Sequence, residues 1–523
     1  MKRTILSLIF HVIILYPMII QAQEYYDTHV ENPLVKENVF LQMKPDLTAL
    51  PVFSEVRSKL PQPYWPARPD VISSYWKAWE IAFSNIKKAE PEINGFISPF
   101  IDPAFNGHIF MWDSHFMLMF GKYGTRAFNF QNTLNNFYAK QHKDGFICRE
   151  IKESDGKDFF ERFDVNSTGP NVFPWTEWEY YLNFNDTVRL KEVFAPLLAY
   201  YQWFRTYRSW PDGTYYSSGW GCGMDNQPRL PSGFNEAWEH AHMSWIDITC
   251  QQVFAGNLLI KMAERLDRMK DVQDIITETN YLKSFINEKL WDDRTSFYYD
   301  RFRDGTLSDV KSIASYWALI GGIVPEKRID RFILHLTNAD EFARLHRVAT
   351  LSADNPEFSP DGDYWRGSIW APTNYMVLRG LTNYGFDSLA FEIASNHLNN
   401  VVSVYTQTGT FFENYAPDKV QGNDRKDFIG WTGLTPVTVL FEYVFGLQPD
   451  VPDNTLVWDI NLIDEFGIDN YPFGNEGIIS LHCKKRRLSG DEPKITISSN
   501  IPLNIVVKWP GGSKKLTIKP IQK

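Results

Sequence analysis

The stretch TVRLKEVFAPLLAYYQWFRTYR, residues 187–208, gives the strongest indication of how this 523-residue chain folds. Its large apolar side chains recur at intervals of three and four residues, a spacing that places them on one face of an α-helix. They are Leu190, Val193, Phe194, Leu197, Tyr201 and Phe204. We therefore predict an amphipathic helix here. Thr176 and Glu179, just before it, have the spacing of a capping box, an N-terminal helix signal.

Further helical patterns fill much of the chain, and short breaks such as Asn383-Tyr384-Gly385 join several of them. The predicted helices span 73–88, 129–140, 244–266, 272–290, 369–381, 387–405 and 430–445. We expect about eleven or twelve helices in antiparallel pairs. Strand patterns between the helices are scarce, which disfavours a parallel α/β sheet. A mainly α fold is predicted, an α/α toroid whose long loops converge at one mouth.

The two ends of the chain differ from this helical middle. Residues 24–69 are rich in Pro and lack a sustained period, which predicts an extended N-terminal arm. After a break at 448–454, the pattern becomes that of short strands at 477–483, 494–499 and 503–509. We therefore predict a helical domain at 70–448 and a small C-terminal β domain at 449–523.

Residues 1–23 have the layout of a secretory signal peptide. Lys2 and Arg3 precede an apolar run from Ile5 to Ile20, which a polar segment follows. A transmembrane anchor is the alternative, but Tyr16 and Pro17 interrupt the run, which is shorter than the roughly 20 residues that a bilayer requires. We expect a secreted or periplasmic protein without stable membrane insertion after the signal is cleaved.

Composition restricts the possible partners. The formal net charge is −10, and no basic run could follow a phosphate backbone, so nucleic acid is not an expected ligand. Aromatic residues make up 15% of the chain, including 18 Trp, and many lie in polar segments with Gly and Pro. Such rings suit sugar-binding clefts, because a pyranose packs its C–H face on an indole or phenol. A helical core with large side chains is the alternative explanation.

Two carboxylates lie in aromatic loops outside the helical pattern. Asp225 occurs in SGWGCGMDNQPR (218–229), and Glu413 in TGTFFENYAP (408–417). Cleaving a glycosidic bond requires a carboxyl that protonates the leaving oxygen and another that activates water. Apolar neighbours would raise the pKa of Asp225, as a general acid needs. The structural alternatives are an Asx-turn for Asp225 and an ion pair with Arg425 for Glu413.

Two other segments contain candidate sugar contacts. Trp112 and Asp113 lie in MWDSHF, although Asp113 is also placed to cap a helix. Arg366 lies between aromatic residues in YWRGSIW (364–370), where it could hold a hydroxyl-rich ligand or pair with Asp361 or Asp363.

Other chemistries find little support. The one close histidine pair, His240 and His242, follows Glu239 and has the spacing of a strand face rather than of a helix face. Cys148, Cys222, Cys250 and Cys483 show no zinc or disulfide spacing. No phosphate loop, nucleophile elbow or dinucleotide fingerprint occurs. We expect neither a cofactor nor a metal ion.

Taken together, the segments WDSHF (112–116), SGWGCGMDNQPR, DYWRGSIW (363–370), FENYAP and FIGWTGL (428–434) resemble glycoside hydrolase family 63. This family includes processing α-glucosidases and mannosylglycerate and glucosylglycerate hydrolases, and it is related to the trehalases. The resemblance runs from about Asn106 to Leu447. It implies an (α/α)6 barrel and inversion of anomeric configuration.

The resemblance also assigns roles by matched position. Asp225 corresponds to the general acid and Glu413 to the general base, and the predicted binding residues are Trp112, Asp113, Arg149, Trp220, Arg229, Trp365, Arg366 and Trp431. Gly-Cys-Gly-Met precedes Asp225 where the family often has a second acid, and Ser368 stands where Pro is usual. These departures bear on the identity of the substrate, an oligosaccharide or small glycoside.

The predicted reaction is hydrolysis of an α-linked glucosyl or mannosyl unit by a single displacement. Three alternatives remain open from the sequence: a polysaccharide lyase on an α/α toroid, a phosphorolytic enzyme on a related barrel, and a noncatalytic glycan-binding protein.

Overall fold

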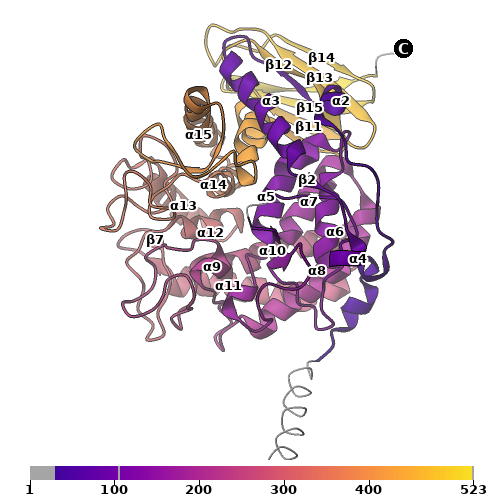
Figure 1. The fold of residues 1–523 in the computed structure, drawn as a ribbon. Coiled ribbons are helices and arrows are strands. Elements are labelled where there is room, and N and C mark those ends of the chain that lie inside the picture. Colours follow the sequence, from indigo (N-terminus) through magenta and orange to yellow (C-terminus); the bar gives the residue numbers. More distant parts are fainter. Residues whose placement is uncertain (1–29, 104–105, 521–523) are drawn as a thin grey trace, which may run out of the picture.

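The computed structural model describes residues 30–103 and 106–520 as a helical body with β-sheets packed on one end (Figure 1). The predicted signal peptide, residues 1–23, lies outside the described residues. The longer helices are α3 (Pro69–Ser84), α5 (Met111–Gly121), α7 (Phe173–Phe184), α8 (Thr187–Tyr207), α10 (Ile246–Arg265), α11 (Gln273–Lys289), α13 (Glu326–Ile333), α14 (Ala371–Asn383) and α15 (Asp387–Thr408). The mainly α prediction is confirmed.

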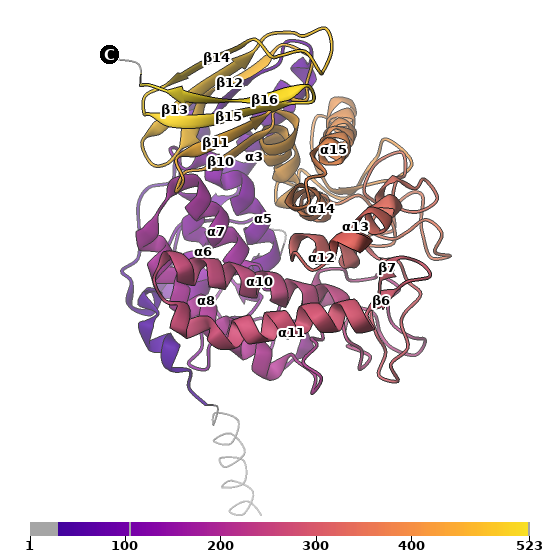
Figure 2. The same ribbon diagram turned by 180° about the vertical axis from the view of Figure 1, so that it is seen from behind.

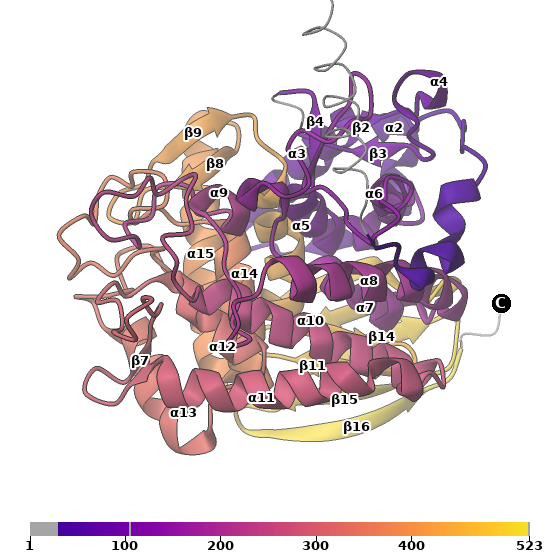
Figure 3. The same cartoon turned by 90° about the horizontal axis from the view of Figure 1, so that it is seen from below.

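Six helical segments form an inner ring. In chain order, α5 contacts α7, α7 contacts α10, α10 contacts α12 (Trp317–Ile320), and α12 contacts α14. The ring closes through η10 (Trp431–Leu434), which contacts both α14 and α5 and leads into the π-helical η11 (Thr435–Val444). Outer helices cover this ring: α8 and α11 pack on α10, and α15 packs on α14 and η11 (Figures 2 and 3).

Short elements connect these helices. The remaining α and 3-10 segments are η1 (Pro33–Glu37), η2 (Val39–Gln42), α2 (Phe53–Val56), η3 (Arg57–Lys59), α4 (Pro91–Asn94), η4 (Lys122–Gly124), η5 (Phe130–Asn132), α6 (Thr133–Tyr138), η6 (Val165–Ser167), α9 (Gly219–Cys222), η7 (Met269–Val272), η8 (Ile313–Tyr316) and η9 (Leu334–Thr337). The short loop strands are β2 (Ile86–Lys87), β3 (Phe100–Ile101), β4 (His108–Phe110), β5 (Glu150–Lys152), β6 (Trp291–Asp292), β7 (Phe297–Tyr298), β8 (Phe412–Tyr415) and β9 (Gly422–Lys426).

Helix α8 begins one residue after its cap, Asp186, whose carboxylate accepts a hydrogen bond from the Arg189 N–H. The capping-box interpretation of Thr176 and Glu179 is wrong, because both residues lie inside α7. The Glu179 side chain instead forms buried ion pairs with Lys122 and Arg379. Helix α7 belongs to the inner ring and is buried on nearly every side, so its polar residues pair with one another inside the protein.

The C-terminal region contains two four-stranded sheets, which stack above the helical ring (Figures 1 and 2). Their strand orders are β1-β12-β13-β14 and β10-β11-β15-β16. The bounds are β1 (Gln62–Tyr64), β10 (Leu447–Asp450), β11 (Thr455–Asp459), β12 (Phe466–Phe473), β13 (Gly477–Cys483), β14 (Ile495–Ser499), β15 (Leu503–Trp509) and β16 (Gly512–Ile518). Alternate residues of β13 are buried, as expected for a strand with one face on a core.

The N-terminal arm takes part in both regions of the fold. Its η1 packs on α8, and its β1 pairs antiparallel with β12, Gln62 opposite Asp469. The Trp65 indole N–H donates to Asp464, 3.1 Å away. The arm therefore ties the helical ring to the C-terminal sheet. The division at 69 and 448 stays a prediction, and β10 crosses the second of these boundaries.

Among the described residues, no helix has the length and apolar character needed to cross a bilayer. The four cysteines are buried as free thiols.

Candidate active site

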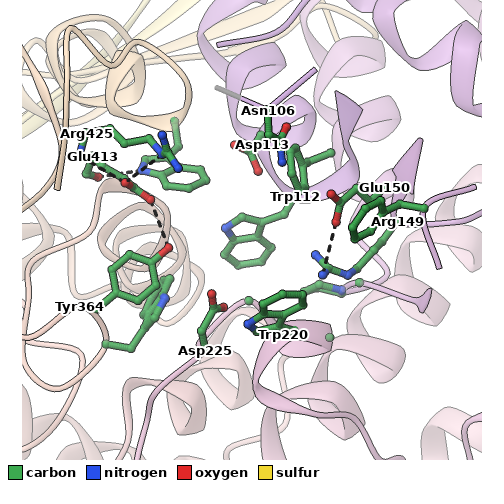
Figure 4. A pocket seen from close by; sticks show the side chains of 18 residues that line it. Asn106, Trp112, Asp113, Arg149, Glu150, Trp220, Asp225, Tyr364, Glu413 and Arg425 are labelled. Atoms are coloured by element: carbon green, nitrogen blue, oxygen red, sulfur yellow. Dashed lines mark hydrogen bonds and ion pairs between the residues drawn. The ribbon is translucent and has the colours of Figure 1, made fainter. Parts of the chain in front are cut away.

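A cavity of about 390 Å³ opens among the loops at one end of the ring. Asp225 and Glu413, 188 positions apart by their numbers, both line it and lie on different sides of the opening (Figure 4). The other lining residues are Asn106, Phe110, Trp112, Asp113, Arg149, Glu150, Phe159, Gly169, Pro170, Trp220, Gly221, Gly223, Tyr364, Trp365, Arg425 and Trp431. The structure thus brings together six of the eight predicted binding residues with both predicted catalytic carboxyls.

Asp225 lies in the turn that follows the one-turn helix α9. Ser218 caps α9, and Gly223 ends it in the left-handed region, with φ of 78°. The turn is fixed to a neighbouring loop because the Asn226 side chain accepts from the Trp365 N–H at 2.8 Å. Burial in the cavity wall raises the pKa of Asp225 to about 6, although the positive charge of Arg149 acts to lower it.

Glu413 lies on β8, in a hairpin with β9. Its two carboxylate oxygens have different donors: Tyr364 donates its hydroxyl at 3.2 Å, and the Arg425 backbone N–H donates at 3.4 Å. The Arg425 guanidinium lies 3.8 Å from the same carboxylate. Burial, reinforced by the negative charge of Asp424, raises the pKa of Glu413 to about 7. The ion pair with Arg425 that the sequence left open therefore exists, and it lies within the cavity.

The two carboxyls differ in the hydrogen-bond donors that stabilise their ionised forms. Glu413 accepts from two donors, which favour and orient a carboxylate, whereas no other residue of the described chain donates a hydrogen bond to the Asp225 carboxyl. This contrast suits Glu413 as the base and Asp225 as the proton donor. The pKa values of the unliganded cavity, about 7 and about 6, have the opposite order. The two values lie close together, so the hydrogen-bond donors, not the pKa values, distinguish the proposed roles.

Trp112 and Asp113 occupy the first turn of α5 and line the cavity. Asp113 is buried, and desolvation, with the nearby charges of Asp102 and Glu413, raises its pKa well above the usual value. It does not cap α5, whose first turn has no side-chain cap. Within the described residues, Asp113 Oδ1 and Trp112 Nε1 are buried without a hydrogen-bond partner. A buried acceptor and donor aimed at a cavity are suited to pair with ligand hydroxyls.

Arg149 and Glu150 line the cavity beside the start of α5, across from Glu413 and Tyr364 (Figure 4). The Arg149 guanidinium lies over the Phe160 ring at 4.8 Å and donates to the Asn166 carbonyl at 2.7 Å, so its position is fixed. Glu150 lies 3.5 Å from Arg149 and 2.6 Å from a His108 ring nitrogen. This wall presents a fixed cation next to a carboxylate (Figure 4).

Two predicted binding residues, Arg229 and Arg366, do not line the cavity. Arg229 is buried below it, with ion pairs of 2.7 Å to both Asp247 and Asp300. It binds the Asp225 turn to the inner helix α10 and so has a structural position. Arg366 pairs at 3.0 Å with each of two acids that do not line the cavity, Glu236 and Glu357. The alternative of an internal ion pair was right for Arg366, with other partners than Asp361 or Asp363.

Several lining residues were not predicted. Tyr364 stood in a quoted motif, directly before Trp365, but nothing in the sequence indicated that its hydroxyl would reach Glu413. Glu150 follows Arg149 directly and lies on β5, which pairs antiparallel with β4 beside the cavity. Phe159 comes from the loop after β5, where the sequence carries no motif.

A ring of inner helices that presents two carboxyls to one aromatic cavity is the arrangement that a glycoside hydrolase requires. A family model described as the mannosylglycerate hydrolase MGH1-like glycoside hydrolase domain matches residues 107–432, and the chain belongs to this family. The resemblance to family 63 is thereby confirmed.

Two relatives show how far the similarity extends. A protein of Borreliella burgdorferi described as uncharacterized is 24% identical over 361 residues, which cover 66% of this chain and 74% of that one. A probable mannosyl-oligosaccharide glucosidase of Schizosaccharomyces pombe is 24% identical over 278 residues, 47% of this chain. The alignment spans 34% of the length of the yeast protein, about a third.

Among solved structures, a family 63 mannosylglycerate hydrolase from Thermus thermophilus in complex with glucose aligns with a TM-score of 0.57. The alignment covers 69% of this chain and 99% of that chain, at 21% identity. This is a similarity of fold. The predicted toroid with a C-terminal β region is confirmed.

Proposed function

We propose that this protein is a secreted, inverting glycoside hydrolase that removes an α-linked glucosyl or mannosyl unit from an oligosaccharide or a small glycoside. The observation that carries the proposal is the convergence of Asp225 and Glu413 on one cavity, each with a pKa raised by burial. The names of the family model and of the S. pombe relative support the choice of mannosyl and glucosyl units. Secretion rests on the predicted signal at 1–23.

In the proposed reaction, protonated Asp225 donates its proton to the glycosidic oxygen as the bond to the anomeric carbon breaks. Glu413 removes a proton from a water molecule that attacks the opposite face of that carbon. One displacement gives inversion, and inverting enzymes hold their carboxyls roughly 6.5–9.5 Å apart to admit the water. The hydrogen bond from Tyr364 orients the Glu413 carboxylate for this step.

The cleaved sugar is proposed to bind over Trp112, with its hydroxyls paired to the unpartnered Asp113 Oδ1 and Trp112 Nε1. Trp431 is well placed to support this position, because its indole N–H donates to the Glu413 carbonyl at 2.8 Å and holds the base in place. Trp365, stacked on Trp370 with ring centroids 3.9 Å apart, forms a rigid wall next to them.

The test is a panel of α-linked gluco- and manno-disaccharides together with glucosyl and mannosyl glycerates. Product analysis by NMR immediately after cleavage is expected to show the β-anomer of the released sugar, because a single displacement inverts an α-linkage. Release of the α-anomer would contradict the mechanism, and an unsaturated sugar product would indicate a lyase. Export is tested by N-terminal sequencing of the mature protein, which is expected to begin after residue 23.

A further inference from the structure

A second hollow lies near the cavity and has an aromatic lining. Its volume is about 420 Å³, and its walls are Phe163, Val165, Tyr216, Phe234, Trp238, Glu239, His240, Ala241 and His242. Three of these rings are unusually exposed: Phe163 at 50%, Phe234 at 39% and Trp238 at 45%. Exposed aromatic side chains gathered at one place indicate a binding surface rather than a core.

The outer hollow, as we call this second pocket, is joined to the active-site cavity by a pair of tryptophans. Trp220 lines the cavity and Trp238 lines the outer hollow, and their ring centroids lie 3.9 Å apart. The pair is held in place by the backbone, because the N–H groups of Gly219 and Trp220 donate to Glu236 and Ala237, each at 3.0 Å. This pair of rings therefore connects the wall of one pocket with the wall of the other.

This surface leaves the cavity on the side of the proposed proton donor. Trp220 belongs to α9, and Asp225 lies in the turn that follows α9 directly. Glu413 and its partner Tyr364 come from other loops, away from this wall (Figure 4). A general acid lies next to the leaving group, so the tryptophan pair extends in the direction of the aglycone.

The outer hollow suits a neutral, hydroxyl-bearing ligand. None of the residues that line it is Lys or Arg, so it offers no fixed positive charge to a carboxylate or phosphate. His240 Nδ1 accepts the His242 N–H at 3.0 Å, which places the proton of the neutral ring on Nε2, where it can be donated. Ala241 and His242 have φ of 47° and 52°, a conformation rarely adopted by residues other than Gly. This turn places both imidazoles at the wall of the hollow.

We propose that the outer hollow is an aglycone subsite that binds a neutral pyranose, stacked on Trp238, beyond the sugar that directly carries the cleaved bond. This inference rests on the proposed function, and it names the substrate class as an oligosaccharide of three or more units. A glycoside of glycerate would leave this surface unused.

The test measures kcat/KM for maltose, maltotriose and maltotetraose and for the matching α-mannooligosaccharides. The ratio of trisaccharide to disaccharide is expected to exceed one in the native protein and to fall about tenfold in Trp238→Ala, the loss of one stacking contact. Trp238→Phe keeps a ring and should recover much of the ratio. Tyr64→Ala is the matched control, since Tyr64 is also 45% exposed but lies on β1 in the C-terminal sheet. Equal ratios in the native and Trp238→Ala proteins would overturn the proposal.

Measuring sugar affinity in an inactive variant tests the subsite independently of the proposed hydrolytic function. In Asp225→Asn, titration of tryptophan fluorescence with the same oligosaccharides reports affinity without cleavage. Tighter binding of the trisaccharide than of the disaccharide, abolished by adding Trp238→Ala, supports the subsite even if the native protein releases no sugar. Equal affinity for both lengths overturns the subsite, whatever the hydrolytic activity. Unfolded variants are recognised by circular dichroism, and Phe234→Ala then replaces Trp238→Ala as the test.

Discussion

Asp225 and Glu413 are two carboxyls with similar pKa values and different surroundings. Burial raises the pKa of both, to about 6 and about 7, so burial alone does not assign their roles. The donors do: Tyr364 and the Arg425 N–H hold Glu413 as an oriented acceptor, while no other described residue donates to the Asp225 carboxyl. The proposed roles therefore depend on hydrogen-bond geometry at single residues.

The first residue-scale prediction concerns proton donation. Asp225→Asn should lower kcat for a natural disaccharide by about 10²–10⁴-fold, because no group then protonates the leaving oxygen. A glycosyl fluoride needs no such proton, so its hydrolysis should fall far less. Glu413→Gln is the contrasting variant, expected to lose activity on both substrates. Equal losses for both substrates in Asp225→Asn would show that Asp225 is not the proton donor.

The second prediction concerns pH. Glu413 acts ionised, so activity falls as pH drops below its pKa of about 7, and Asp225 acts protonated, so activity falls as pH rises above its pKa of about 6. The profile of kcat/KM should be a bell with its maximum between these values. Asp424→Asn removes a charge that raises the pKa of Glu413, so the maximum should move to lower pH. An unchanged profile, matching that of the exposed control Asp361→Asn, would contradict this account.

At the scale of elements, amphipathic periodicity predicted the helix bounds well where one face of the helix is exposed to solvent. The prediction at 187–208 matches α8 to within one residue, and the β13 and β15 bounds are as predicted. Helix α7 was missed, and α5 was foreseen only as a helix start near Asp113, because the inner ring buries both helices on nearly all sides and so removes the periodic pattern. The segment predicted as a helix at 430–445 is helical, but as a 3-10 turn and a π-helix.

The residues of the candidate site could be predicted where they lie in short sequence motifs. Trp112, Asp113, Asp225 and Glu413 were found because short segments with unusual composition carry them, and the structure brings them to one cavity. The direction of a long side chain was not predictable. The guanidinium of Arg229 turns to two buried acids, and a sequence does not reveal which way a side chain leaves a loop.

The prediction at the scale of elements concerns the stability that Arg229 contributes, because Arg229 connects the Asp225 turn to α10. Arg229→Met leaves Asp247 and Asp300 buried without their cation and should lower the free energy of unfolding by about 3–5 kcal/mol. Arg366→Met is the matched comparison: its partly exposed ion pairs should contribute only about 1 kcal/mol or less. Denaturant unfolding measures both. Equal stabilities of the two variants would show that the Arg229 network does not anchor the turn.

At the scale of the molecule, the N-terminal arm joins parts of the chain that are far apart in sequence. It places η1 on α8 and β1 at the edge of the C-terminal sheet, next to β12. The sequence predicted an extended arm, but the strand that it adds to the sheet could not be foreseen, since β1 is only three residues long.

The prediction at the scale of the molecule concerns a truncated variant that lacks this arm. A chain that begins at Pro69 should have a clearly lower melting temperature and a tendency to aggregate, because β12 becomes an open sheet edge. A chain that begins at Val30 retains η1 and β1 and serves as the control. Differential scanning calorimetry and light scattering compare the two. Identical melting curves would show that the arm contributes nothing to the stability of the sheet.

The pairing of β1 with β12 also has a consequence for biosynthesis. Trp65 and its partner Asp464 are separated by 399 residues, so this edge of the sheet cannot form until nearly all of the polypeptide has left the ribosome. The nascent chain must wait for its last strands before it can adopt the complete structure.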